Sequence, residues 1–457
     1  MNKILGFIMK KETSPITGND LTIDQIVSLV TNPDTRIEVA QNTLKNIESA
    51  RAFLEREMNR RVIYGVNTGF GPMASHIISP KNLQALQENL ILSHATGMGK
   101  PIEDRFVLAA MVVRLNTLAK GYSGVSVALI EQLQRFINDR IIPVVPEHGA
   151  VGTSGDLVQL AHIALALLGK GKVHYQGTEQ QTAVVLKKLG IKPYILKAKE
   201  GLSLINGTSV MTGISALLCD EASRMLTLAS RNGALALELV AAFKDGISEV
   251  LHDLRPHPGQ RRIAKNLRNL LSSSRLLRER SSLNKHNGHH QYDIQEIPEE
   301  VQEVYSLRCI PQILGPILET YWETCRTLEI EMNSVSDNPI VVWKAEQFLH
   351  GGNFHGDFVA ASIDKLKIAV VKLAMLSERR TNYFLNYKIN KLFPPFLNLR
   401  RPGLNLALQG LQFVSTSTAA QNQSLAFPHH IHSISTNADN QDVVSMGTDA
   451  ALLAAKV

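Results

Sequence analysis

Residues 148–157 read HGAVGTSGDL, a run of small residues in which Ser154 lies between the carbonyl group of Thr153 and the nitrogen of Gly155. This arrangement permits chemistry on the backbone itself. Attack of the Gly155 nitrogen on the Thr153 carbonyl, with dehydration of Ser154, yields an imidazolone ring that bears a methylidene group. Glycine leaves the attacking nitrogen unhindered, and a β-hydroxyl is needed for the dehydration. The segment therefore encodes a candidate electrophile. The alternative interpretation is an ordinary turn or helix start with Ser154 as the N-cap.

Further motifs follow in order along nearly the whole chain. They are YGVNTGFG (64–71), GTSGDL (152–157), NGT (206–208), YSLRC (305–309), SDNP (336–339), GNFH (352–355) and NQD (440–442). Together they resemble the motifs of the aromatic amino acid ammonia-lyases, the family of histidine, phenylalanine and tyrosine ammonia-lyases. The family usually carries alanine where this chain has Thr153. Because the methylidene comes from Ser154, we expect ring formation to survive the larger side chain.

The resemblance implies a mainly α-helical fold, a fumarase/aspartase-like long-helix bundle. It also implies an N-terminal, loop-rich helical domain over residues 1–205 that carries the prosthetic-group loop, followed by a central helical-bundle domain over residues 206–457. Family members normally continue through further helices, so we expect the chain ending at Val457 to be a fragment that lacks them.

Apolar residues at steps of three and four independently predict three long helices that form a central bundle. The three stripes are Val359, Ile363, Leu366, Val370, Leu373 and Leu376; Ile214, Leu217, Leu218, Met225, Leu228 and Ala229; and Ile313, Leu314, Ile317, Leu318 and Tyr321. Before about residue 200, glycine and proline interrupt the pattern, which indicates loops on shorter helices.

The composition favours a large soluble enzyme, with 457 residues, 44% hydrophobic and 19% charged. A net charge of +7 without a dominant basic block indicates solvated faces and gives no reason to expect nucleic-acid or membrane binding. Residues 403–438 carry no formal charge but are rich in amides and hydroxyls, so they predict buried polar structure near a site and no membrane span. Cys219, Cys309 and Cys325 lack CxxC spacing, which argues for a reducing compartment and a cytoplasmic location.

Histidines gather in two places, and neither group has the spacing of a known metal motif. The groups are His286, His289 and His290, and His429, His430 and His432. Without cysteines or carboxylates at ligand spacing they are interpreted as polar loop residues, and no metal is expected. The string at residues 97–101 (GMGKP) lacks the full glycine spacing of a phosphate loop, so no nucleotide is expected either.

Elimination of ammonia from an α-amino acid requires a base for the weakly acidic β-proton and an electrophile that assists departure of the amine. The resemblance assigns the base to Tyr64. A phenol ordinarily ionises at a pH of about 10, so the site must stabilise the phenolate, and helix N-termini pointing into it would do so. The resemblance also assigns the substrate carboxylate to Arg308, helped by the amide of Asn338. Taken in isolation, Tyr64 would be a core tyrosine and Arg308 a surface or ion-pair arginine.

The remaining site residues also follow from the resemblance. Asn206 matches a residue that hydrogen-bonds the prosthetic ring, Tyr305 and Gln312 match residues near the amine and the ring, and Phe354 matches one packed beside the electrophile. Further positions expected around the substrate are Gly71, Ser93, His94, Gln421, Asn440 and Gln441. The alternative for each amide or aromatic residue is a satisfied place in the core.

Two regions bear on substrate choice. Ser93-His94 resembles histidine ammonia-lyases, but some tyrosine-specific bacterial members also carry it, and an imidazole pairs with either an imidazole or a phenol. Gln421 replaces an acidic residue typical of histidine ammonia-lyases, and residues 440–447 look more like the phenylalanine and tyrosine branch. We therefore expect L-tyrosine as substrate, possibly with L-phenylalanine, giving 4-coumarate (or cinnamate) and ammonia. The alternatives are a histidine ammonia-lyase giving urocanate, a tyrosine 2,3-aminomutase and a noncatalytic relative.

The resemblance also implies a homotetramer whose active sites combine residues of neighbouring subunits. A monomer is therefore expected to be inactive.

Overall fold

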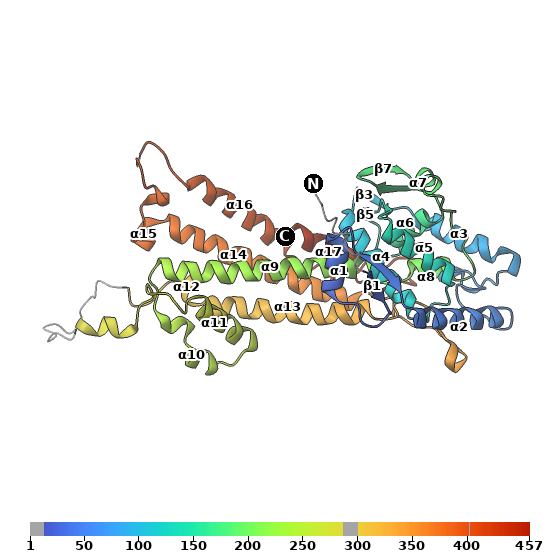
Figure 1. Ribbon diagram of the computed structural model, residues 1–457, viewed down its shortest axis with the longest axis horizontal. Helices are drawn as coiled ribbons and strands as arrows, with labels where there is room; N and C mark the ends of the chain where they lie inside the picture. Colours follow the sequence, from blue (N-terminus) through green and yellow to red (C-terminus); the bar gives the residue numbers. More distant parts are fainter. Residues whose placement is uncertain (1–12, 287–299, 402) are drawn as a thin grey trace, which may run out of the picture. The chain divides into compact units, whose positions relative to one another are not determined.

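The computed structural model describes residues 13–286, 300–401 and 403–457 (Figure 1). Helices dominate and the strands are short, which confirms the expected mainly α-helical class. The chain divides into two compact units that interleave along the sequence. The domain boundary expected at residue 205 stays a prediction.

The first unit comprises the described residues up to Asp220 together with Thr324–Asp364 and Pro428–Ala455. Its shorter helices are α1 (Ile23–Thr31), α2 (Gln41–Glu57), α3 (Leu83–His94), α4 (Asp104–Ala119), α5 (Val127–Asn138), α6 (Leu157–Leu167), α7 (Thr182–Lys188), α8 (Glu200–Ile205) and the 3-10 helices η1 (Gly71–Met73), η2 (Pro80–Asn82) and η5 (Trp343–Ala345). Helix α4 is buried on all sides from Phe106 to Ala119, and α3, α6 and α8 pack against one another. A helix buried all round belongs to the centre of a unit.

The first unit also contains small sheets of two or three strands. The strands are β1 (Thr13–Ile16), β2 (Arg36–Val39), β3 (Met98–Pro101), β4 (Ile142–Pro143), β5 (Pro146–His148), β6 (Lys172–Tyr175), β7 (Thr178–Gln181), β8 (Ile340–Val342) and β9 (Gln347–Leu349). Strand β1 is parallel to β2, with Thr13 opposite Arg36, whereas β3–β5, β4–β6–β7 and β8–β9 are antiparallel. The β6–β7 hairpin turns at Gln176-Gly177, both with positive φ, as a tight two-residue turn requires.

The second unit comprises Glu221–Glu323, Lys365–Phe427 and Lys456–Val457. It contains α10 (Glu249–Asp253), α11 (Pro258–Leu270), α12 (Tyr305–Arg308), α15 (Tyr387–Asn390), α16 (Gln409–Leu425) and the 3-10 helices η3 (Lys244–Ile247), η4 (Arg280–His286) and η6 (Pro395–Leu397). The chain passes between the units within α9 (Ser209–Leu239), α13 (Ile310–Met332), α14 (Asp357–Leu385) and α17 (Gly447–Lys456).

The three long helices predicted from periodicity are α9, α13 and α14, and Figure 1 shows them as the longest in the chain. In the second unit, Leu237 of α9, Leu314 of α13 and Leu373 of α14 belong to one apolar core cluster. The stripe predicted on α9 is wrong in part, because Met225 and Leu228 are 39% and 55% exposed.

The prediction of buried polar structure near a site over residues 403–438 is wrong about the burial, although Thr436 and Asn437 of this range line a cavity. Of α16, which occupies much of this range, only Ala419 and Asn422 are buried. Amide and hydroxyl side chains carry no charge but remain well solvated, so a lack of charge did not indicate burial here. Within the described ranges, no helix is long and apolar enough to cross a membrane.

Candidate active site

The Thr153-Ser154-Gly155 backbone is held from one side by the segment that precedes α17. The hydroxyl of Ser445 donates to the carbonyl oxygen of Gly152 at 3.0 Å. The amide of Met446 donates to the carbonyl of Val151 at 3.0 Å, and that of Gly356 donates to Gly152 at 3.3 Å. These contacts fix the backbone of Val151 and Gly152, directly before the ring-forming residues.

Gly207 holds the same backbone from the other side. Its amide donates to the carbonyl of Ser154 at 3.2 Å, and its carbonyl accepts from Asp156 N at 2.8 Å. A Cβ atom on Gly155 would lie 2.0 Å from the Gly207 oxygen, so there is no room for a side chain. Ser154 and Gly155 both adopt left-handed conformations, with φ of 60° and 74°. Such values are uncommon for serine and suit glycine, so the packing imposes a sharp local turn.

Four helices begin next to the contacts just described: α6 at residue 157, α9 at 209, α14 at 357 and α17 at 447. The unpaired amides at helix N-termini carry partial positive charge.

Asp156, which is fully buried, accepts hydrogen bonds from Val210 N at 2.8 Å, from Met211 N at 3.0 Å and from the hydroxyl of Thr448. Burial raises the pKa of Asp156 to about 6, against the effect of these donors, which favour the ionised form.

The residues present fit the formation of the methylidene-imidazolone. Among the described residues, neither the amide of Gly155 nor the carbonyl of Thr153 forms a hydrogen bond, so the two groups that must react are not engaged elsewhere. Asn206 Nδ2 donates to the Ser154 carbonyl at 3.4 Å, and its buried Oδ1 has no partner. Gln441 Nε2 donates to the Ser154 hydroxyl at 3.1 Å. Both amides are therefore placed to hold the ring atoms.

Thr153, the departure from the family pattern, is accommodated. Its side chain is 7% exposed, and its hydroxyl donates to the carbonyl of Val443 at 3.1 Å. The extra polar atom is therefore satisfied without engaging the atoms that would form the ring.

A cavity of about 390 Å³ opens beside the serine. It is lined by Tyr64, Phe70, Gly71, Leu90, His94, Gly149, Ala150, Val151, Thr153, Ser154, Gly155, Leu157, Val158, Leu202, Asn206, Thr436, Asn437 and Gln441. The phenol oxygen of Tyr64 accepts a hydrogen bond from Gly71 N at 3.0 Å, and its ring meets Phe70 edge to face at 6.4 Å. The phenol oxygen of Tyr64 therefore has a fixed position at the cavity wall.

His94 lies at the end of α3, at the cavity wall. Its Nδ1 is 2.9 Å from the carbonyl oxygen of Leu90, and the Ser93 hydroxyl is 3.1 Å from both atoms. A carbonyl oxygen can only accept, so Nδ1 carries the proton and donates. In the neutral imidazole, Nε2 is then left as a hydrogen-bond acceptor.

The structure therefore brings eight of the expected site residues together around one cavity: Tyr64, Gly71, His94, Thr153, Ser154, Gly155, Asn206 and Gln441. Four others of the first unit do not line it. Ser93 is exposed next to His94 at the end of α3. Phe354 is half-buried in the turn before α14, Asn440 is exposed, and Asn338 is half-buried after α13, with its Oδ1 accepting from Gly351 N at 2.9 Å.

The remaining expected residues belong to the second unit. Tyr305 is 69% exposed, and the guanidinium of Arg308 lies 4.7 Å from the centre of its ring. Among the described residues, Arg308 Nε and Gln312 Oε1 are buried without a hydrogen-bond partner. Gln421 is exposed on α16.

Sequence reasoning missed Thr436, Asn437 and Gln87. The first two line the cavity, and a Cβ on Gly71 would lie 2.8 Å from Asn437 Nδ2. Gln87, buried on α3, donates to the Gly65 carbonyl at 3.0 Å and accepts from Leu202 N at 3.0 Å, which ties the Tyr64 loop to α8. The polar run around Asn437 was the one available signal. A lone glutamine in a helix gives none.

Within the described part of the chain, no three histidine, cysteine or carboxylate side chains form a group that could hold a metal ion. In the second histidine group, two side chains contact carboxylates: His430 Nδ1 lies 2.7 Å from Asp364 and His429 Nε2 lies 3.6 Å from Asp449. The side chains of His286, His289 and His290 lie outside the described residues.

Comparison with known proteins gives the family. The family described as "Aromatic amino acid lyase" matches residues 21–457. A histidine ammonia-lyase of Streptococcus gordonii is 40% identical over 443 residues, which cover 97% of this chain and 82% of the relative. A tyrosine 2,3-aminomutase of Chondromyces crocatus is 40% identical over 443 residues, which cover 95% and 83%.

Among solved structures, the tyrosine aminomutase of Streptomyces globisporus is similar, with a TM-score of 0.92 and 35% identity, and the match covers 97% of this chain and 84% of that one. The fold and the site thus define a carbon–nitrogen lyase. The chain belongs to the aromatic amino acid lyase family, as the sequence motifs predicted.

Proposed function

We propose that the protein eliminates ammonia from L-tyrosine to give 4-coumarate, by means of a methylidene-imidazolone formed from Thr153, Ser154 and Gly155. The observation that carries the proposal is the cavity in which Tyr64, His94 and the ring-forming serine face the same space. Its volume of about 390 Å³ suits a single small ligand.

In this proposal each side chain has one task. When formed, the ring supplies an electrophilic methylidene carbon that assists departure of the amine. Tyr64 takes the β-proton of the substrate, and the amide of Gly71 stabilises the phenolate. Asn206 and Gln441 hold the ring through the contacts that they make to Ser154. Arg308 and Asn338 bind the substrate carboxylate.

The tyrosine preference rests on the charge of the cavity lining, with His94 as a hydrogen-bond acceptor. With Nδ1 donating to Leu90, Nε2 accepts the hydroxyl proton of a substrate phenol. No acidic side chain is among the cavity-lining residues of the described chain, so an imidazolium would find no charge partner there. A neutral phenol needs none. Phenylalanine would lose the hydrogen bond and bind more weakly.

Histidine is the second candidate. Relatives that are 40% and 38% identical are named histidine ammonia-lyases, and Nε2 of His94 accepts an imidazole N–H as well as a phenol O–H. A tyrosine 2,3-aminomutase, which returns ammonia to the β-carbon, is the third, supported by relatives of that name.

One assay separates these activities. The protein is incubated separately with tyrosine, phenylalanine and histidine, and the ultraviolet absorbance of coumarate, cinnamate and urocanate is followed. Chromatography of the tyrosine reaction detects the β-amino acid. Coumarate as the main product supports the proposal, and urocanate or β-tyrosine in its place refutes it. No product with any substrate indicates a noncatalytic relative.

We also propose that the enzyme is a cytoplasmic homotetramer whose sites combine residues of neighbouring subunits. Cys219, Cys309 and Cys325 form no disulfide, in keeping with a reducing compartment. Light scattering coupled to size-exclusion chromatography gives the mass of the assembly. A monomer with full activity would refute the shared site.

A further inference from the structure

Helix α8 links two site residues of the first unit, Tyr64 and Asn206. All six of its residues are buried, and it ends directly before Asn206. Its Leu202 packs against the Tyr64 loop, where a Cβ on Gly65 would lie 2.4 Å from Leu202 Cδ2. Displacement of α8 would therefore move both Tyr64, the proposed base, and the amide of Asn206.

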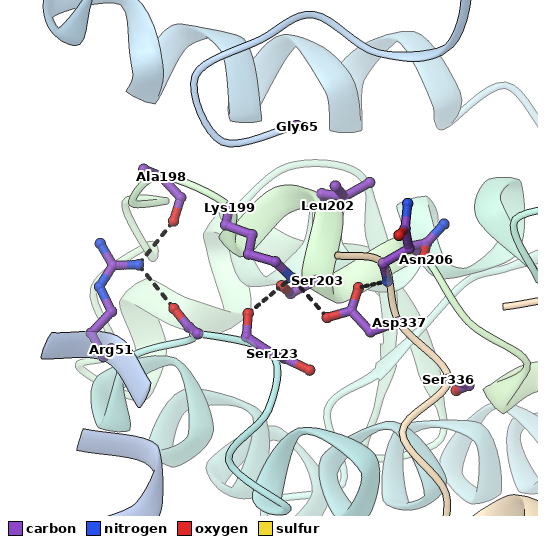
Figure 2. A network of polar contacts seen from close by, with 12 residues as sticks. Arg51, Gly65, Ser123, Ala198, Lys199, Leu202, Ser203, Asn206, Ser336 and Asp337 are labelled. Carbon is purple, nitrogen blue, oxygen red and sulfur yellow. Dashed lines mark hydrogen bonds and ion pairs between the residues drawn. The ribbon is translucent and has the colours of Figure 1, made fainter. Parts of the chain in front are cut away.

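A buried ion pair joins this helix to the segment that carries Asn338. Lys199, in the left-handed conformation at the N-cap of α8, places Nζ 2.9 Å from Asp337 Oδ2. Both side chains are 0% exposed. Figure 2 shows Lys199 reaching across to Asp337 and Ser203, while Leu202 lies on the side of α8 toward Gly65.

Both members of the ion pair, Lys199 and Asp337, also form hydrogen bonds to other residues. Lys199 Nζ donates to Ser203 Oγ at 3.0 Å, and that hydroxyl donates to the carbonyl of Ser123 at 3.0 Å. On the other side, Asp337 Oδ1 accepts the backbone amide of Asn338 at 2.7 Å. The two oxygens of Asp337 therefore have separate tasks: one binds the lysine and the other fixes the backbone of Asn338.

A hydrogen bond from the backbone of Gly351 holds the Asn338 side chain in one orientation. Its Oδ1 accepts from Gly351 N, so its Nδ2 is left as the donor. A donor suits a carboxylate ligand. Arg114, fully buried on α4, binds the carbonyls of both Asn206 and Ser336 and so maintains the spacing of the two segments independently.

We propose that Lys199 and Asp337 are positioning residues for the substrate carboxylate: the buried pair fixes Asn338 against α8, so that its amide keeps its place relative to Asn206. Neither side chain touches the substrate. The inference rests on the proposed function in two respects: the ligand carries a carboxylate, which all three candidate substrates share, and the Asn338 amide binds it.

A buried charge without a partner is strongly destabilising, so a single substitution would confuse folding with positioning. The test is therefore the neutral double variant Lys199→Met/Asp337→Asn, in which the methionine fills the space of the lysine stem and the asparagine keeps an oxygen for the Asn338 amide. Lys120→Met is the matched control, because among the described residues its ammonium binds Gly18 and Asn19. Intact mass establishes ring formation in each variant.

For the double variant we expect a mature ring, a kcat within about three-fold of wild type and a KM about ten-fold higher, the effect of impairing one hydrogen bond to a charged ligand group. The inhibition constant of the carboxylate product should rise by the same factor. That of the decarboxylated product, 4-vinylphenol for tyrosine, should not change. Lys120→Met should leave all three constants unchanged.

An unchanged KM in the folded double variant overturns the positioning role, and so does equal weakening of both inhibitors. If the wild-type protein uses histidine, urocanate and 4-vinylimidazole replace the two inhibitors, so the substrate assignment fails while the inference is still tested. If no amino acid reacts, calorimetric binding of the three unsaturated acids replaces KM. Absence of all binding overturns the inference.

Discussion

Alanine at position 155 would place its Cβ 2.0 Å from the Gly207 carbonyl oxygen, whereas real Cβ contacts below 3.0 Å essentially never occur. Gly207 must therefore move by about 1 Å, which breaks its two hydrogen bonds to residues 154 and 156 at a cost of about 1 kcal/mol each. A non-glycine residue at φ 74° costs about 1–2 kcal/mol more. We expect Gly155→Ala to lower the free energy of unfolding by about 3–4 kcal/mol and to prevent ring formation.

Gly177→Ala is the matched control. Gly177 has φ of 77°, but nothing lies within 4 Å of a Cβ there, so only the conformational cost of about 1–2 kcal/mol applies. Urea unfolding of the two variants measures the difference, and intact mass reports the ring. Equal stability of the two variants, together with a mature ring in Gly155→Ala, would refute the steric argument.

Three further predictions concern single side chains. Tyr64→Phe should keep the mature ring, measured by intact mass, and lower kcat by about 10²–10⁴, as removal of a general base does; near-normal turnover would exclude Tyr64 as the base. The pKa of Asp156 rises from an ordinary value of 3.8 to about 6 on folding, so its contribution to stability is full below pH 3.8 and is lost as the pH rises to about 6. Urea titrations at pH 4 and 7 should therefore show Asp156→Asn gaining about 2 kcal/mol relative to wild type between the two, and a pH-independent difference would contradict the raised pKa. Thr153→Ala should lose only the hydrogen bond to Val443, about 1 kcal/mol in the same titration, and an immature ring would show that the hydroxyl has a role in cyclisation.

The sequence predicted the local features of this protein well. The long helices followed from apolar periodicity, because burial of one face demands it. Ring formation from Thr153, Ser154 and Gly155 stays a prediction from chemistry, which rests on the β-hydroxyl of the serine and the unhindered nitrogen of the glycine. Asn206 and Gln441 were found through motifs, and their contacts to Ser154 give these motifs a physical meaning.

Other features depend on tertiary contacts that no local pattern records. Gln87 reads as one polar residue in a helix, yet its amide joins the Tyr64 loop to α8. Lys199 and Asp337 lie 138 positions apart, so their pairing is visible only in the fold. Met225 and Leu228 fit the apolar periodicity of α9 but are exposed. Periodicity identifies an apolar face of a helix, but it does not say which residues cover that face.

The central claim is that Thr153, Ser154 and Gly155 condense to form the electrophile. Intact mass spectrometry of the purified protein, beside the Ser154→Ala variant, tests it most directly. The account predicts a wild-type mass lower than that of the encoded chain by two molecules of water, and a variant that lacks the second dehydration. A wild-type mass equal to that of the unmodified chain would contradict it.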